Sequence, residues 1–264
     1  MKNISSLQNP LIRQLLLYKE KSRARRRAEL FLIEGQREIS LAIRGGYEID
    51  LALFNPEICP ETEVKSLIPD AQEYISVSSE VYGRLAYREG TQGVIAIAKF
   101  KDFNLADLKF ETENPLILVA EAPEKPGNIG GLLRTADAAK LDAVIIANPI
   151  TDLFNPNIIR SSVGCVFTNQ IAMGSTNEII SYLIENNINI YCAALQASDL
   201  YTTQDYGSAS AIVVGTESTG LSDEWLDNST QNIKIPMAGE IDSMNVSVAA
   251  GILIFEAVRQ RNFD

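Results

Sequence analysis

The chain of 264 residues contains no histidine, and this absence removes several kinds of active site. A serine or cysteine nucleophile activated by histidine is excluded, and so is a metal site with imidazole ligands. Cysteine is scarce too: Cys59, Cys165 and Cys192 lie far apart and form no CxxC pair. This pattern argues against a disulfide framework or a zinc site and is typical of a protein in a reducing cytoplasm.

Long apolar runs are missing as well. No stretch is long enough to span a bilayer, and the first six residues lack the apolar core of a signal peptide. We therefore expect a cytoplasmic protein that binds neither a membrane nor a metal ion. The composition is otherwise ordinary: 46% of the residues are apolar and 22% are charged, and 264 residues suffice for two domains.

Charge is distributed unevenly along the chain. The formal net charge is −11, which by itself is unusual for a protein that binds nucleic acid. Residues 1–44, however, contain ten Lys or Arg against four acidic residues, and five of the seven residues 21–27 are basic. Because phosphate contacts dominate non-specific nucleic-acid affinity, this run predicts an RNA-binding segment. A solvated helix face or a protein-binding arm would have the same composition. The predicted RNA contacts are Arg23, Arg25, Arg26 and Arg27.

Candidate strands and helices alternate along the chain, which predicts an α/β fold. Residues 1–28 have a basic, helical pattern, and residues 101–114, which are charged and without periodicity, mark a boundary. We expect a small N-terminal α/β domain over residues 1–105 and a second domain with a mostly parallel sheet over residues 106–264. Strands are predicted at 29–33, 49–54, 74–77, 93–99, 116–120, 143–147, 170–173, 190–195, 211–214 and 232–235, and helices at 35–44, 79–88, 177–186 and around 160–164.

The last thirty residues combine a strand, a loop and a helix. The strand ends at Pro236, and the apolar positions 246, 249, 250, 253 and 254 then have the spacing of one buried helix face. Ser243, Asn245 and Ser247 lie where this helix begins. Such side chains either cap the free backbone N–H groups of a helix start or hold a polar ligand there.

Two further turns follow buried strands. Residues 121–136 contain the spacing Asn-x-Gly-x-x-x-Arg, from Asn128 to Arg134, and residues 215–220 place an acid, Glu217, between two glycines. A strand, a glycine-containing turn and a helix make a natural ligand site, because helix N–H groups point out of the turn. The first turn is not a GxGxxG sequence, so a dinucleotide site is poorly supported. Each turn alone is also compatible with an ordinary surface turn.

Taken in order, the three segments resemble the motifs of SpoU-type RNA ribose methyltransferases, which belong to the knotted SPOUT class. Residues 235–247 match the third motif. Thr216 and Ser218 stand where the second motif usually has asparagine and glycine. Residues 1–45 resemble the small ribosomal RNA-binding α/β domain that precedes the catalytic domain in many of these enzymes. The positions matching the first and second motifs are Asn128, Arg134, Gly215, Glu217 and Gly220.

The resemblance implies a trefoil-knotted C-terminal domain that binds S-adenosylmethionine and forms a homodimer across the final helix. The implied activity is methylation of a ribose 2′-hydroxyl in RNA, with ribosomal RNA favoured over transfer RNA as the substrate. The residues that match cofactor positions are Leu195, Gly215, Ile235 and Met244. The candidates for catalysis are Arg134, Asn128, Glu217, Ser243 and Asn245.

The chemistry of Arg134 follows from its charge. The resemblance suggests that this arginine activates the ribose hydroxyl, but a guanidinium is effectively never neutral in a protein. We therefore favour a charged Arg134 that holds a phosphate or stabilises the developing alkoxide, while the other four candidates orient it and the ribose. Positioning should supply much of the acceleration, since the sulfonium methyl group is already activated.

Three alternatives remain open from the sequence. One is a methyltransferase that acts on transfer RNA, and another is a catalytically silent RNA-binding or ribosome-assembly protein that keeps the fold. The third is a nucleotide-dependent oxidoreductase, which only the α/β pattern suggests and the missing GxGxxG disfavours.

Overall fold

The computed structural model describes residues 2–87, 92–195, 198–216, 218–240 and 243–262. The chain forms two compact units, of which the first comprises residues 1–102 and 152–168, and the second residues 103–151 and 169–264. Residues 152–168 therefore fold with the first unit, although the chain on both sides of them belongs to the second. A single boundary between residues 105 and 106, as expected from the sequence, leaves this excursion out.

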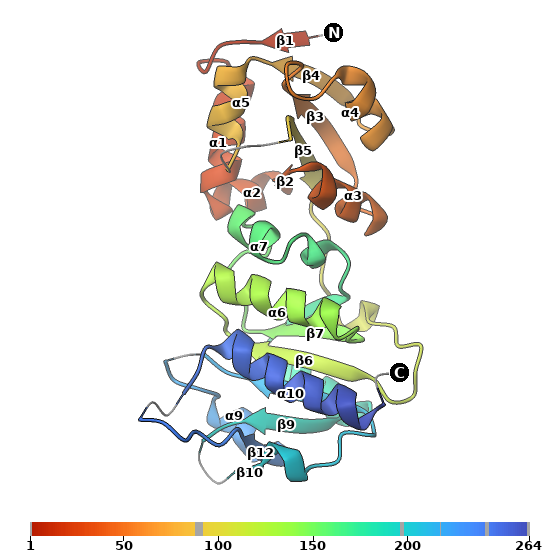
Figure 1. Ribbon diagram of the computed structural model, residues 1–264, viewed down its shortest axis with the longest axis vertical. Coiled ribbons are helices and arrows are strands. Elements are labelled where there is room, and N and C mark those ends of the chain that lie inside the picture. The colour runs from red at the N-terminus through yellow and green to blue at the C-terminus, as the bar shows by residue number, and fades with distance from the viewer. Residues whose placement is uncertain (1, 88–91, 196–197, 217, 241–242, 263–264) are drawn as a thin grey trace. The chain divides into compact units, whose positions relative to one another are not determined.

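The first unit is built on a five-stranded mixed sheet with the strand order β1-β4-β3-β5-β2. β4 is parallel to both β1 and β3, whereas β5 is antiparallel to both β3 and β2. α1 and α5 lie side by side on one face of the sheet, and α3 and α4 cover the other (Figure 1). The strands and helices are β1 (Lys2–Ile4), α1 (Pro10–Glu20), α2 (Ser22–Ala28), β2 (Leu30–Glu34), α3 (Gln36–Arg44), β3 (Ile49–Phe54), α4 (Glu61–Leu67), β4 (Glu73–Val77), α5 (Ser79–Leu85), β5 (Val94–Lys99) and α7 (Pro156–Ser161).

The first 28 residues are not one helical segment, contrary to the prediction. β1 pairs with β4 and buries Ile4, and such a short strand leaves no period-2 pattern to detect. α1 begins at Pro10, where the Asn9 side chain accepts a hydrogen bond from the Leu11 N–H at 2.9 Å. Lys21 has an extended backbone, with φ −119° and ψ 113°, and separates α1 from α2.

The second unit contains a seven-stranded sheet with the order β10-β12-β9-β11-β6-β7-β8, and every strand pair in it is parallel. The predicted parallel sheet is confirmed. β6, β7 and β11 are buried along their whole length, as expected for strands covered on both faces. The elements are β6 (Leu116–Glu121), α6 (Pro126–Ala138), β7 (Ala143–Ala147), β8 (Ile171–Gly174), α8 (Thr176–Glu185), β9 (Asn189–Ala193), β10 (Asp199–Leu200), β11 (Ser210–Val214), α9 (Asp223–Asp227), β12 (Gln231–Lys234) and α10 (Val246–Gln260).

α6 and α10 lie side by side over this sheet (Figure 1). Gly131 of α6 permits the close approach, because a Cβ atom at this position would lie 3.0 Å from the Cβ of Ser247 in α10. Further along the two helices, a Cβ at Gly251 would lie 3.8 Å from Thr135. This packing brings the start of α6 next to the start of α10, and with them the first and third sequence motifs.

Besides β1, three further short elements were not anticipated. α4, α9 and β10 are seven, five and two residues long, too short for a clear periodic pattern. The helix expected around 160–164 ends at Ser161 and is α7. The longer predicted strands agree closely, and those at 49–54 and 143–147 have the predicted bounds. The trefoil knot stays a prediction.

Candidate active site

A pocket of about 420 Å³ lies in the second unit, at the carboxyl ends of neighbouring parallel strands. This edge is where ligands bind in parallel α/β sheets. The lining residues are 193–195 at the end of β9, 214, 215 and 218–221 at and after the end of β11, 233–235 and 237 at the end of β12, and 243, 244, 246, 249 and 253 before and within α10, together with Leu226. All four positions predicted to contact the cofactor are among the lining residues: Leu195, Gly215, Ile235 and Met244.

The turn after β11 requires a glycine at its first position. A Cβ at Gly215 would lie 2.2 Å from the carbonyl carbon of Gly220 and 2.5 Å from the Leu221 nitrogen, so no side chain fits there. Two backbone hydrogen bonds of 3.1 Å between Thr216 and Gly220 close the turn, and Gly220 has a φ of +71° that favours glycine. At Gly215 the turn therefore presents bare backbone to the pocket.

Thr216 supports this turn in place of the asparagine of the usual motif. Its Oγ1 accepts a hydrogen bond from the Thr219 N–H at 3.1 Å and lies 2.7 Å from the Thr219 Oγ1. The hydroxyl therefore stabilises the turn from within. Glu217, the predicted acid of this motif, lies outside the described residues.

The first and third motifs meet through two asparagines. The Asn245 Nδ2 donates a hydrogen bond to the Asn128 Oδ1 at 3.0 Å. The Asn245 Oδ1 accepts from the Ser247 N–H at 3.0 Å and from the Ser247 hydroxyl at 2.6 Å. Asn245 therefore caps α10 and at the same time holds Asn128, so the two interpretations of this residue, cap and site residue, do not exclude each other.

A second cavity of about 100 Å³ adjoins the first. It is lined by Asn128, by residues 123–125 of the loop before α6, and by Thr216. Gly215, Ser218 and Val246 line both cavities. Lys125, which sequence reasoning did not single out, adds a positive charge to the wall, although it lies within the 121–136 segment already recognised.

The other predicted catalytic residues are less closely grouped. Ser243 lines the larger pocket. Arg134, on α6, is exposed and lines neither cavity, and its side chain makes no hydrogen bond or ion pair with any described residue. Within one chain, the described structure therefore does not bring Arg134 together with Asn128, Ser243 and Asn245.

The basic run in the first unit is only partly available to a ligand. Arg23, Arg26 and Arg27 of α2 are exposed, but Arg25 is buried, with 2% of its surface accessible. Its Nε lies 2.7 Å from an Asp152 carboxylate oxygen, and its Nη1 donates to the Tyr18 carbonyl oxygen at 2.6 Å. The expectation that Arg25 contacts RNA was wrong, because this guanidinium is occupied inside the unit by a residue far along the chain.

Residues 152–168 are held in the first unit by aromatic packing as well. Phe154 stacks on Phe31 with ring centroids 4.1 Å apart, and Phe167 packs edge-on against Tyr47 at 5.1 Å. Phe100 completes the cluster, 4.4 Å from Phe154. The segment is therefore integral to this unit.

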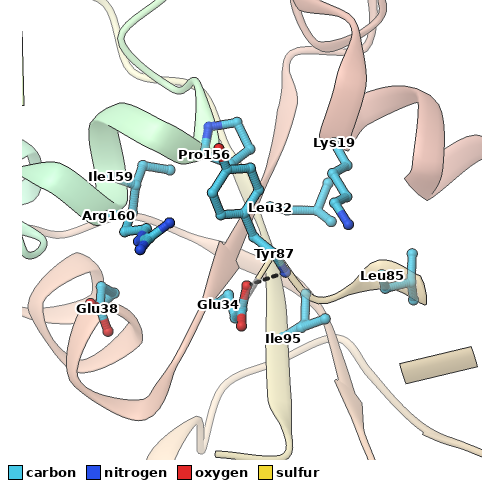
Figure 2. Close-up of a pocket in the computed structure, with 10 residues that line it drawn as sticks. All are labelled: Lys19, Leu32, Glu34, Glu38, Leu85, Tyr87, Ile95, Pro156, Ile159 and Arg160. Carbon is cyan, nitrogen blue, oxygen red and sulfur yellow. Dashed lines mark hydrogen bonds between the residues drawn. The ribbon is translucent and has the colours of Figure 1, made fainter. Parts of the chain in front are cut away.

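A small cavity of about 30 Å³ in the first unit is lined by residues of α1, β2, α3 and α7 and by Tyr87 (Figure 2). Glu34 accepts a hydrogen bond from the Tyr87 N–H at 2.6 Å, and the Arg160 guanidinium lies 5.7 Å from the Tyr87 ring centroid. The space is about that of a single water molecule, so the cavity is not a cofactor site.

The described cysteines are buried and poorly suited to nucleophilic chemistry. Burial, aided by Glu121, raises the pKa of Cys192 to about 12, and burial also raises the pKa of Cys59. Nowhere in the described ranges do three metal-ligating side chains gather. The helices in these ranges include none with the length and apolarity of a membrane span.

In comparisons with known proteins, each of the two parts of the chain matches the model of a known protein or domain family. The model of the SpoU rRNA Methylase family matches residues 115–255, and that of the MRM3-like substrate binding domain matches residues 9–96. The 23S rRNA (guanosine(2553)-2′-O)-methyltransferase RlmP of Bacillus subtilis is 27% identical over 97% of this chain and 98% of its own.

Solved structures extend this likeness to the fold. The crystal structure of an RNA 2′-O ribose methyltransferase is 36% identical, with a TM-score of 0.84, and covers 98% of this chain and 99% of its own. An AdoMet-bound rRNA methyltransferase from Sinorhizobium meliloti is 27% identical, with a TM-score of 0.89 over 98% and 97% of the two chains.

Proposed function

The chain belongs to the SpoU rRNA Methylase family, and from this premise we propose that it methylates one ribose 2′-hydroxyl of 23S ribosomal RNA. The predicted enzyme class, an S-adenosylmethionine-dependent RNA methyltransferase, is confirmed, as is the α/β fold with its smaller N-terminal part. Ribosomal RNA is the substrate named for RlmP and for the 23S rRNA (uridine(2479)-2′-O)-methyltransferase of Streptomyces viridochromogenes, which match 97% and 90% of this chain, and this favours it over transfer RNA. The alternatives of a silent RNA-binding protein and of an oxidoreductase have no such support.

The observation that carries the proposal is the 420 Å³ pocket. Its volume is that of a typical small-molecule site. Ile233, Leu226 and Leu253 give it apolar walls suited to an adenine ring, and the bare backbone at Gly215 leaves room for a polar ligand to approach. These residues fit S-adenosylmethionine, which when bound supplies an electrophilic methyl group. We assign its contacts to Leu195, Gly215, Ile235 and Met244.

The adjoining 100 Å³ cavity is the proposed place of the ribose. Asn128 and Asn245 are already joined there by a hydrogen bond, which fixes the amide groups before a substrate arrives. Ser243 offers a further hydroxyl from the larger pocket. Arg134 is assigned the stabilisation of the developing alkoxide as a permanent cation, and Glu217 the orientation of these groups.

The cofactor assignment is tested at Gly215. Substitution Gly215→Ala places a methyl group 2.2–2.5 Å from backbone atoms of the turn and should abolish S-adenosylmethionine binding in calorimetry. The matched control is Gly239→Ala in the neighbouring loop, where a Cβ meets nothing within 4 Å and the affinity should stay as in the wild type. Wild-type protein that fails to bind the cofactor at millimolar concentration would overturn the proposal, because even a dissociation constant of 1 mM corresponds to a binding free energy of only about −4 kcal/mol.

We also propose that the enzyme acts as a homodimer through α10. Val248 and Phe255, seven residues apart on this helix, are 54% and 42% exposed, which is unusual for large apolar side chains on one helix face. The neighbouring helix α6 carries Arg134, which is not part of its own chain's pocket. A partner docked on α10 would bring the Arg134 of one chain towards the pocket of the other.

A mixed dimer tests this arrangement. Arg134→Ala and Gly215→Ala should each be inactive alone, and mixing the two variants should restore part of the activity, because one site then combines an intact pocket with an intact arginine. Light scattering should give twice the mass of 29.0 kDa. A monomeric mass, or mixed dimers without activity, would contradict the proposal.

A further inference from the structure

Glu121, the last residue of β6, is a buried carboxylate that the sequence motifs leave unexplained. Only 6% of its surface is accessible, and no Lys or Arg of the described ranges forms an ion pair with it. Neutral donors satisfy it instead. Oε1 accepts from the Ser222 hydroxyl at 2.8 Å and from the Thr176 hydroxyl at 3.1 Å, and Oε2 accepts from the Ser222 N–H at 2.8 Å.

Stability alone does not account for a carboxylate at this position. Removing an anion from water is costly, and well-packed apolar residues of similar size are often at least as stable as buried charges. A carboxylate instead provides strong hydrogen-bond acceptors with preferred directions, and these hold the donor groups in place. The question is therefore what Ser222 and Thr176 hold in turn.

Ser222 ends the turn that forms one wall of the 420 Å³ pocket. Residues 218–221 line that pocket, and Ser222 is the next residue. Ser222 occupies the cap position of α9 but makes no side-chain capping bond, because its hydroxyl is directed to Glu121. The turn is thus anchored at its start by β11 and at its end by two hydrogen bonds to Glu121.

Thr176 lies on the other side of the carboxylate and leads away from the pocket. It is the first residue of α8, and its Oγ1 accepts a hydrogen bond from the Asn148 Nδ2 at 3.0 Å. Neither Thr176 nor Asn148 lines the pocket. Glu121 therefore makes two sets of hydrogen bonds, which we call its two arms. The arm to Ser222 reaches the pocket wall, and the arm to Thr176 contacts only residues away from the pocket.

We propose that Glu121 is a positioning residue for S-adenosylmethionine, which holds the 215–221 turn in its binding shape through Ser222. The inference rests on the proposed function in one respect, that this pocket binds the cofactor. Its effect is on cofactor affinity, since Glu121 itself does not line the pocket.

The two arms supply a matched pair of variants. Ser222→Ala and Thr176→Val each remove one hydroxyl from the same carboxylate oxygen, and both should lower the melting temperature. Only Ser222→Ala should weaken S-adenosylmethionine binding, by about tenfold, as expected for one lost hydrogen bond to a charged group. Glu121→Gln should behave as Ser222→Ala, raising KM for the cofactor with kcat at saturation largely kept. Thr176→Val should stay within twofold of the wild type.

Amide hydrogen exchange on the ligand-free proteins gives a reading that does not depend on cofactor binding. Exchange at Thr219 and Gly220 should be faster in Ser222→Ala and Glu121→Gln than in Thr176→Val. Equal losses of affinity and equal exchange in both arms, or none in either, would overturn the proposal. If wild-type protein binds no cofactor, the proposed function fails, while the exchange data still decide whether Glu121 holds the turn.

Discussion

Both units bury a charged side chain, but they satisfy it in opposite ways. In the first unit, Arg25 meets the opposite charge of Asp152, whose side chain is also buried. In the second, Glu121 meets only neutral hydroxyl and N–H groups. The ion pair joins two side chains that lie far apart in the sequence. The Glu121 carboxylate instead accepts hydrogen bonds from both the hydroxyl and the backbone N–H of Ser222, which fixes the backbone at that residue. Arg25 therefore fastens a segment to its unit, and Glu121 shapes a turn beside a pocket.

The units also differ in where they present their functional side chains. The second unit gathers them in loops at one edge of a parallel sheet, around two adjoining cavities. The first unit offers exposed arginines on a seven-residue helix and, in the cavity of Figure 2, no room for a small ligand. This division fits a catalytic role for the second unit, which would bind a small cofactor, and a polyanion-binding role for the first unit.

The largest effect should come from Arg134. Arg134→Ala should lower methyl transfer by about 10²–10³-fold or more, as for the loss of one group that stabilises transition-state charge. S-adenosylmethionine affinity should remain near the wild-type value, because Arg134 does not line the pocket. Single-turnover assays on ribosomal RNA, with calorimetry for the cofactor, measure both. Near wild-type turnover would reject the assigned role, and substantial activity in Arg134→Lys would favour simple charge over bidentate contact.

Removal of Arg25 should destabilise the first unit selectively. Arg25→Met leaves Asp152 buried and unpaired, at a cost of about 3–5 kcal/mol, and the double variant with Asp152→Leu should recover most of that loss. Trp225 is the only tryptophan and is buried in the second unit, so its fluorescence reports on that unit, whereas circular dichroism reports on both. The circular dichroism transition should move and the fluorescence transition should not. Equal shifts in both signals would show that the ion pair supports the whole chain.

Neutralising the exposed arginines should affect RNA binding alone. Gln at positions 23, 26 and 27 should weaken affinity for ribosomal RNA fragments and reduce the slope of log affinity against log salt by about 2–3, for three lost phosphate contacts. Cofactor affinity should be unchanged. Arg37 and Arg44, exposed on α3, provide a control pair, whose replacement should have less effect on the slope. Identical salt slopes for the wild type and both sets of variants would show that RNA binds to a surface other than α2.

The smallest effect concerns Glu256 on α10. Hydrogen bonds from Arg259 hold the pKa of Glu256 at about 2, below its ordinary value of 4.5. A carboxyl group with a lowered folded-state pKa stabilises the fold above the unfolded value, and this stabilisation is lost as the pH falls from 4.5 through 2. Glu256→Gln should therefore lower stability by less than about 1 kcal/mol at pH 7, and the difference should vanish below pH 2. Melting curves at several pH values give the test, and a difference that persists at the lowest pH would exclude this cause.

Much of the second unit follows from local sequence. Strands such as 143–147 are continuous apolar runs, because a parallel strand is buried on both faces of its sheet, and such a run can be recognised in the sequence. The glycine at 215 and the asparagine at 245 are dictated by their immediate backbone, by a turn that admits no Cβ and by a helix start that needs a cap. Such residues are recognisable in a sequence because their causes lie within a few positions.

Only the tertiary structure decided the roles that depend on distant partners. Arg23 and Arg25 are indistinguishable as neighbours in a basic run, yet one is exposed and the other is buried against Asp152, 127 residues away. Glu121 also depends on a distant partner, because it is hydrogen-bonded to Ser222, 101 residues further along the chain. Composition and spacing determine which charges a chain carries and which segments form strands and helices. Which charge meets solvent, which holds a fold together and which shapes a pocket depends on contacts that form only when remote segments pack.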